Sequence, residues 1–205
     1  MRFGKHLLSD QTVINWCYKP ATRDSLVTTS KKTLLQSANK TEKAWARGLI
    51  GGEGSQWTTL LCQELVKEAL IELGRENVRR TKGMKGSIRE KTYEPDLECN
   101  EYVYEVKGRS WTTPGTAGEK ILGVPLKYGE LPKLYGKPLR IILVGYQEYE
   151  ARNGYAFGDL LDRKIQTTEL RESLEYFRKH NIEYIGFTDI LNQLGYSYKE
   201  QTNSR

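Results

Sequence analysis

The 205-residue chain is predicted to adopt a mixed α/β fold, with a central mixed β-sheet flanked by helices. Two observations predict this class. An amphipathic helical pattern precedes two strand-like segments joined by a short turn, and a run of branched aliphatic residues is followed by a helix–strand unit. Helix, hairpin, strand and helix–strand in that order indicate one mixed sheet with helices on both of its faces.

The N-terminal region is expected to be helical in part. Segment 30–47 carries apolar residues at roughly helical intervals, namely Leu34, Leu35, Ala38 and Ala44–Ala46. Segment 51–55, with three glycines in five residues, should end that helix. Segment 57–73 then reads as an amphipathic helix whose apolar face contains Leu61, Leu65, Val66, Ala69, Leu70 and Leu73. Gly74 is the expected C-cap.

The middle of the chain predicts the hairpin. A strand is expected over 92–99, Asn100–Glu101 forms a two-residue turn, and a second strand covers 102–107. A loop over 112–118 and a short helix over 119–128, broken near Pro125, should follow. Segment 139–144 is an aliphatic run typical of a buried strand.

The C-terminal part predicts a helix over 168–180, with Leu170, Leu174 and Phe177 on its inner face, and a strand over 182–187. Thr188 is the expected cap of a last short helix. We expect one domain over 1–205. Within it, 1–55 forms a helical recognition or dimerisation region, 56–190 forms the core, and 196–205 ends in a frayed tail.

Composition and charge restrict the classes of function. The net charge is +6 and the pI about 9.1, which favours an anionic partner. Between Arg75 and Lys91 seven basic residues face only two acidic ones, and such clusters gain affinity for nucleic acid by releasing counterions. A solvated loop would have the same composition. No apolar run is long enough to span a bilayer. The three cysteines form no metal-binding pattern and indicate reduced, buried thiols in a cytoplasmic protein.

The candidate chemistry lies in Pro95–Asp96 and Glu105–Val106–Lys107. Residues two apart on a strand point the same way, so Glu105 and Lys107 share a face. Asp96, on the neighbouring strand, and Glu105 are candidate metal ligands, and Val106 could add its carbonyl oxygen. Lys107 could hold the attacking water or stabilise charge on a phosphate. The alternative is an ordinary ion pair on a strand, because this pattern is common by chance.

With those residues in view, segment 57–146 resembles the PD-(D/E)XK nuclease superfamily, and most closely a type II restriction endonuclease. The resemblance implies a restriction-endonuclease-like fold, Asp96 and Glu105 as Mg²⁺ ligands and Lys107 as the catalytic lysine. Asp96 and Glu105 are closely spaced, so a tight hairpin is required. Members of the superfamily often carry a further glutamate on the preceding helix. Glu64 is the candidate for it, although it lies opposite the apolar face.

Other residues are candidates for DNA contacts. They comprise basic residues before the motif and polar or basic residues after it: Arg79, Arg80, Lys82, Lys85, Arg109, Thr112, Thr113 and Lys120. A second basic–aromatic stretch contains Lys127, Tyr128, Lys133, Tyr135 and Lys137. It could follow a nucleic-acid backbone, although aromatic residues at this spacing are more often packing residues.

The resulting expectation is a Mg²⁺-dependent endonuclease that hydrolyses double-stranded DNA at a short, palindromic site and leaves 5′-phosphate ends. One or two Mg²⁺ ions would be the cofactor. A two-fold site favours a homodimer. Two alternatives remain open. One is a structure-specific nuclease of the same superfamily, such as a Holliday-junction resolvase or a repair nuclease. The other is a non-enzymatic DNA-binding protein.

Overall fold

The protein is described by a computed structural model that covers residues 6–20, 31–51, 56–87, 92–110, 119–153, 160–162, 164 and 166–200, without the side chains of 31–39 and 119. Its centre is a five-stranded sheet in the order β1 (Arg79–Arg80), β4 (Leu97–Glu98), β5 (Val103–Arg109), β6 (Leu139–Gly145) and β7 (Ile182–Gly186). The pairs β1–β4 and β4–β5 are antiparallel, whereas β5–β6 and β6–β7 are parallel. The predicted mixed sheet is therefore confirmed.

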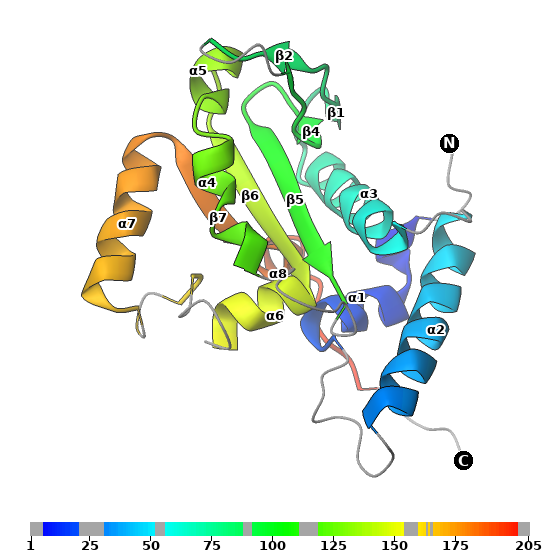
Figure 1. Cartoon of the computed structure of the whole chain (residues 1–205). Coiled ribbons are helices and arrows are strands. Elements are labelled where there is room, and N and C mark those ends of the chain that lie inside the picture. The colour runs from blue at the N-terminus through cyan, green and yellow to red at the C-terminus, as the bar shows by residue number, and fades with distance from the viewer. Residues whose placement is uncertain are drawn as a thin grey trace.

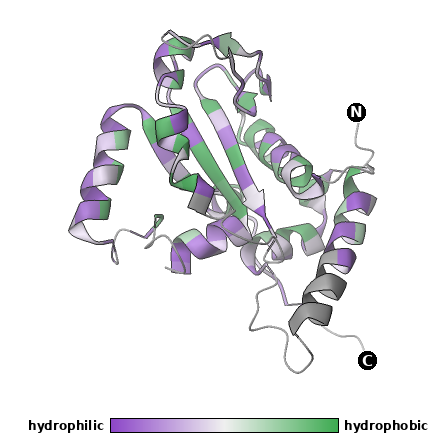
Figure 2. Ribbon diagram, in the orientation of Figure 1, coloured by the Kyte–Doolittle hydropathy of each residue, from purple (hydrophilic) through white to green (hydrophobic). Residues whose placement is uncertain are grey.

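Helices cover both faces of the sheet (Figure 1). One face packs against η1 (Leu7–Ser9), α1 (Gln11–Tyr18), α2 (Lys31–Ile50), α3 (Trp57–Glu72) and α8 (Phe187–Gln193). The other packs against η4 (Glu119–Ile121), α4 (Val124–Lys127), α5 (Leu131–Tyr135), α6 (Tyr146–Asn153) and α7 (Thr168–Lys179). Strand β6 is buried on both faces, which explains its continuous aliphatic run. In Figure 2 it is mostly green, whereas β5 alternates.

The N-terminal elements are part of the same core as the sheet. Leu7, Val13 and Ala46 are fully buried in one apolar cluster with α3 and the inner residues of β5. Trp16 adds a hydrogen bond from its Nε1 to Glu42 Oε1 at 2.7 Å, which joins α1 to α2. No helix among the described residues has the length and hydrophobicity to cross a membrane.

The hairpin that the sequence predicts is present. Leu97 pairs with Tyr104, and the Cys99 N–H donates to the Tyr102 carbonyl at 2.9 Å, so Asn100 and Glu101 form the turn. The Cys99 thiol accepts from the N–H groups of both Glu101 and Tyr102 at 3.4 and 3.3 Å. A tight turn of this kind fixes the register of the two strands.

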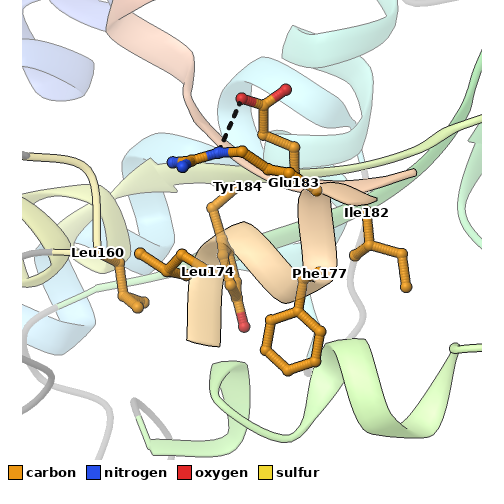
Figure 3. A pocket seen from close by; sticks show the side chains of 7 residues that line it. Leu160, Leu174, Phe177, Ile182, Glu183 and Tyr184 are labelled. Atoms are coloured by element: carbon orange, nitrogen blue, oxygen red, sulfur yellow. Dashed lines mark ion pairs between the residues drawn. The ribbon is translucent and has the colours of Figure 1, made fainter. Parts of the chain in front are cut away.

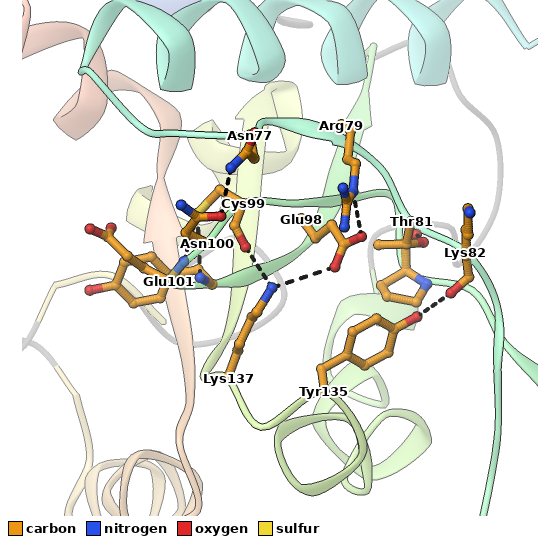
Figure 4. Close-up of polar contacts among 12 residues, drawn as sticks. Asn77, Arg79, Thr81, Lys82, Glu98, Cys99, Asn100, Glu101, Tyr135 and Lys137 are labelled. Carbon is orange, nitrogen blue, oxygen red and sulfur yellow. Dashed lines mark hydrogen bonds and ion pairs between the residues drawn. The ribbon is translucent and has the colours of Figure 1, made fainter.

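Lys137, just before β6, binds two residues of the hairpin (Figure 4). Its Nζ donates to the Cys99 carbonyl at 2.8 Å and lies 3.6 Å from Glu98 Oε2. Glu98 is itself buried, and its other oxygen accepts from Arg79 Nε at 2.9 Å. The buried carboxylate is thus paired on both sides, as burial of a charge requires.

Several sequence expectations need correction. The strand expected over 92–99 is two strands, because Pro95 cannot donate to a ladder; β3 (Thr92–Tyr93) instead pairs with β2 (Met84–Lys85). Thr188 is not the cap of α8. Gly186 occupies that position, and the Thr188 N–H and hydroxyl both donate to Glu148.

Other expectations are confirmed. Helix α3 ends where predicted, with Gly74 at φ +77°, and its predicted apolar face is buried apart from the half-buried Leu73. The helix expected over 119–128 is interrupted near Pro125 as predicted, since η4 ends at Ile121 and α4 begins at Val124, with Pro125 in its first turn, where the missing N–H is tolerated. Helix α7 turns Leu174 and its neighbours to the core. The three cysteines are buried and unpaired. The loop over 112–118 and the last five residues of the tail lie outside the described residues.

Close packing of α3 on β5 depends on Gly108. A Cβ at this position would collide with the Cys62 thiol and lie 2.9 Å from the Cys62 Cβ. We expect Gly108→Ala to lower the free energy of unfolding by about 1–3 kcal/mol, because overpacking forces the helix away from the strand. Urea denaturation measures the change. Adding Cys62→Ala should restore part of the loss.

Gly48→Ala is the matched control. Gly48 lies in α2, and a Cβ added there would meet no atom within 4 Å beyond the backbone of its own helix. Alanine at this position should raise the free energy of unfolding by about 0.5–1 kcal/mol. Equal effects of the two substitutions would contradict the packing argument.

Candidate active site

The candidate site begins where the β4–β5 ladder stops. Because Leu97 pairs with Tyr104, the register brings Pro95 opposite Val106. Proline has no N–H and cannot donate to the Val106 carbonyl. The Pro95 carbonyl, which the ladder would offer to the Val106 N–H, accepts from the Thr81 hydroxyl, and the Val106 N–H donates to Asp96 Oδ2 at 2.6 Å. The Asp96 carboxylate thus takes the place of a backbone acceptor. The Val106 carbonyl lies opposite Pro95, which has no N–H to donate to it.

Asp96 is held from the opposite side by helix α3. Gln63 Nε2 donates to Asp96 Oδ1 at 2.6 Å. Each carboxylate oxygen therefore accepts one hydrogen bond: Oδ2 from strand β5 and Oδ1 from helix α3. These two donors fix the orientation of the side chain at the edge of the sheet.

Glu105 and Lys107 share one face of β5, as expected from the two-residue period. It is the face that carries Val103 and packs beneath α4. Glu105 is 3% exposed, and its Oε1 forms an ion pair with Lys107 Nζ. Among the described residues, its other oxygen, Oε2, is buried without a hydrogen-bond partner. An unpaired buried acceptor is costly unless a further group binds to it.

The two carboxyl groups are electrostatically unfavourable together. Burial raises the pKa of Asp96, although the Val106 N–H, Lys107 and Gln63 act against the rise. Burial also raises the pKa of Glu105, and the nearby charge of Asp96 raises it further, whereas Lys107 lowers it. The site thus holds two desolvated carboxyl groups that a cation would stabilise.

These residues fit a hard divalent cation such as Mg²⁺. The oxygen donors are Asp96, the unpaired Oε2 of Glu105 and the carbonyl of Val106. The described residues contain no group of three or more His, Cys, Asp or Glu side chains able to hold a metal. Two carboxylates, completed by water and substrate phosphate, are nevertheless a usual protein contribution to a Mg²⁺ site.

The structure does not bring Glu64 to the carboxylate pair. Its Oε1 lies 3.4 Å from Arg80 Nη2 and its Oε2 lies 4.0 Å from Lys67 Nζ. Gln63, the preceding residue, makes the contact with Asp96 instead. Arg80, the partner of Glu64, does lie close enough to Asp96 for its charge to lower the pKa of that carboxyl.

The basic residues expected to bind DNA differ in their surroundings. Arg79 and Arg80 are 66% and 61% exposed, but each is paired with an acidic side chain. Lys82, Lys85 and Lys120 are exposed. The described part of the chain provides no ion-pair partner for them. Their charge is therefore available to an anion.

Arg109 is not the free phosphate-binding residue that the sequence suggested. Its Nε donates to Glu150 Oε2 at 3.0 Å, its Nη2 pairs with the other oxygen of Glu150, and its guanidinium stacks 5.0 Å from the centre of the Tyr146 ring. Both charged side chains are about nine-tenths buried. The pair fastens β5 to α6. Thr112 and Thr113 lie outside the described residues.

The sequence interpretation missed the contribution of Tyr128 to the site. Tyr128 is buried beneath the Glu105 face, and burial together with the charge of Glu105 raises its pKa. Lys127, next to it, lowers the pKa of Glu105 through its charge. The sequence identifies both residues only as part of a basic–aromatic stretch, because no local pattern predicts the crossover that places α4 over β5.

The small cavity between α7 and β7 is a poor alternative site (Figure 3). Its volume is about 10 Å³, which is room for no more than one water molecule. Its lining is mostly apolar, and its charged groups, Arg178 and Glu183, pair with each other at 3.5 Å. This cavity is therefore too small to bind a substrate.

A scan against models of protein families found no match to this chain, and searches of curated proteins and of solved structures found none either.

The raised pKa of Glu105 predicts how stability changes with pH. Folding favours the protonated carboxyl, so its stabilising contribution is fully present below the ordinary pKa of 4.5 and is lost as the pH rises through the raised value. In EDTA at pH 7 we expect Glu105→Gln to increase the free energy of unfolding. The difference from the unsubstituted protein should shrink towards pH 4, as measured by urea denaturation.

Glu101→Gln provides the control, because Glu101 is half exposed and pairs with Arg75 at the surface. It should change stability by less than about 0.5 kcal/mol at either pH. A Glu105→Gln protein that is less stable than the unsubstituted one at pH 7 would show that the Lys107 pair outweighs burial.

Proposed function

We propose that the protein is a Mg²⁺-dependent endonuclease that hydrolyses double-stranded DNA at a short, specific site. The observation that carries the proposal is the Asp96 carboxylate, anchored on the Val106 N–H at 2.6 Å beside the Glu105–Lys107 pair. This arrangement gathers two carboxylates, a carbonyl and an ammonium at one end of a hairpin. It is also the arrangement expected for a PD-(D/E)XK nuclease, with the motif strands preceded by helix α3.

The chemistry follows from these groups. Bound Mg²⁺ would activate a water molecule and neutralise charge on the scissile phosphate. Asp96 and Glu105 would hold it, with the Val106 carbonyl as a third ligand. Lys107 is 32% exposed along its side chain, so its ammonium can reach solvent and substrate. In that position Lys107 orients the attacking water and stabilises the charge that builds on the phosphate oxygens.

The surroundings of the site suit DNA. Exposed Arg79, Arg80, Lys82 and Lys85 lie on the chain segment that leads through β1 and β2 towards Asp96. The net charge of +6 supports binding to a polyanion. We further propose a homodimer, which would match a palindromic site, and a cytoplasmic location, where three free thiols remain reduced.

A structure-specific nuclease would use the same site. Digestion of a long linear duplex of known sequence separates the two possibilities. Discrete bands with 5′-phosphate ends support sequence-specific cleavage, whereas cutting confined to junctions or lesions supports the alternative. No Mg²⁺-dependent nicking in any buffer would favour a non-enzymatic DNA-binding protein, in which Glu105 and Lys107 are a structural ion pair.

Asp96→Asn and Lys107→Met should each lower the rate of DNA cleavage by a factor on the order of 10² to 10⁴, because each removes a group that acts on the metal or the water. DNA binding measured in EDTA should change little. Single-turnover cleavage of a labelled duplex measures the loss.

Lys137→Met is the matched control for Lys107→Met. Lys137 also pairs with a buried glutamate on the hairpin, Glu98, but lies away from the carboxylate pair. It should lower stability while the cleavage rate is kept. Full cleavage by purified Asp96→Asn or Lys107→Met protein would refute the site.

A further inference from the structure

The three lysines of the basic–aromatic stretch have different surroundings. Lys137 is bound to Glu98 and to the Cys99 carbonyl, so its charge is compensated. Lys133 is exposed on α5. Lys127 lies at the end of α4, directly before the buried Tyr128. The stretch is therefore not one continuous basic strip.

The Lys127 ammonium contacts both the hydroxyl and the ring of Tyr128. Its Nζ donates to Tyr128 Oη at 2.9 Å and lies 4.4 Å from the centre of the Tyr128 ring. The Tyr128 ring is buried and packs edge-on against Tyr93, with ring centres 6.2 Å apart. The Lys127 side chain remains exposed. A rigid aromatic support thus holds an ammonium group that still reaches solvent.

The Lys127–Tyr128 contact lies beside the candidate site. Tyr128 belongs to the apolar cluster that also contains Val103, on the same face of β5 as Glu105 and Lys107. The effect of Glu105 on the pKa of Tyr128, and of Lys127 on that of Glu105, agrees with this proximity. Helix α4 therefore carries Lys127 to the rim of the Glu105–Lys107 face.

The charge of Lys127 lies close enough to Glu105 to lower the pKa of that carboxyl, but unlike its neighbours' charges it is not held in an ion pair with any described residue. Lys107 pairs with Glu105, Arg80 with Glu64, and Arg109 with Glu150. The partner of Lys127 is a phenol, which is neutral at pH 7 because its ordinary pKa is about 10, and burial raises that pKa further. The ion pairs of the described residues do not include one for Lys127. It can thus bind an anion without first breaking an ion pair.

We propose that Lys127 binds a backbone phosphate of the substrate at the rim of the site, with Tyr128 as its positioning residue. This inference rests on the proposed function and adds a substrate contact to it. The Lys127 ammonium would donate to a non-bridging phosphate oxygen, as lysine does at many phosphate sites. Because the contact is to the backbone, it supplies affinity for any sequence.

The test compares Lys127→Ala, Lys127→Arg and Tyr128→Phe with Lys133→Ala, a control that removes an exposed charge from the next helix. Binding of a labelled duplex of about 20 base pairs is measured in EDTA over a series of salt concentrations, so that no cleavage occurs. Lys127→Ala should weaken binding and reduce the salt slope by about 0.9, the value for one lost phosphate contact. Lys127→Arg should keep the slope.

Tyr128→Phe keeps the ring but removes the hydroxyl that accepts from Lys127, so its affinity should fall between those of the unsubstituted and Lys127→Ala proteins. In cleavage assays Lys127→Ala should raise KM while kcat changes little. Lys133→Ala should match the unsubstituted protein in slope and KM. A thermal midpoint near that of the unsubstituted protein verifies folding of each variant.

Three outcomes overturn the inference. Lys127→Ala could keep the salt slope and KM of the unsubstituted protein, Lys133→Ala could lose as much slope as Lys127→Ala, or Lys127→Ala could lower kcat with KM unchanged. In each case the unsubstituted protein still cleaves, so the proposed function stands. If the unsubstituted protein neither binds nor cleaves DNA, both fail together.

Discussion

The hydrogen bond from the Val106 N–H to Asp96 Oδ2 is the interaction on which the rest of the site depends. The ladder between β4 and β5 ends at Leu97, because Pro95 has no N–H for the Val106 carbonyl and its own carbonyl accepts from the Thr81 hydroxyl. The side chain of Asp96 takes the place of that carbonyl and is thereby brought close to Glu105. The end of the ladder beside this proline is thus where a side-chain carboxylate, Asp96, binds the Val106 N–H.

The electrostatics of the site follow from this placement. Burial raises the pKa of both carboxyl groups, and the charge of Asp96 raises that of Glu105 further. The Lys107 ammonium offsets only part of these rises. Glu105 Oε2 remains buried without a partner among the described residues. Glu42 Oε2 is also buried without a described partner, whereas two other buried carboxylates are better compensated: Glu98 by Arg79 and Lys137, and Glu150 by Arg109. This contrast supports the proposal that Glu105 is a metal ligand.

Local sequence patterns predicted most of the fold. The apolar period of α3, the aliphatic run of β6 and the Asn100–Glu101 turn each depend on neighbouring residues, so they are legible in sequence. The pairing of Glu105 with Lys107 follows from the same strand period. Thr188 was misread because its hydroxyl has a distant partner, Glu148, 40 positions earlier, which outcompetes the capping role.

The positions of the other residues around the site depend on tertiary packing, which local sequence patterns do not predict. Glu64 and Gln63 are adjacent, and only the rotation of α3 against the sheet determines that Gln63 reaches Asp96. From its position after the motif, Arg109 is expected to be a basic residue that contacts phosphate. In the structure it is instead covered by α6 and forms an ion pair with Glu150. Tyr128 and Lys127 reach the site through a crossover between β5 and β6, which no short window reveals.

Anomalous diffraction from crystals grown with Mn²⁺ and a DNA duplex tests the central claim most directly. The account predicts a manganese peak about 2.0–2.6 Å from a carboxylate oxygen of Asp96 and from Glu105 Oε2, which is the range of bonding distances for hard divalent cations. A map with no peak between these two carboxylates, and with Lys107 still paired to Glu105 beside bound DNA, would contradict it.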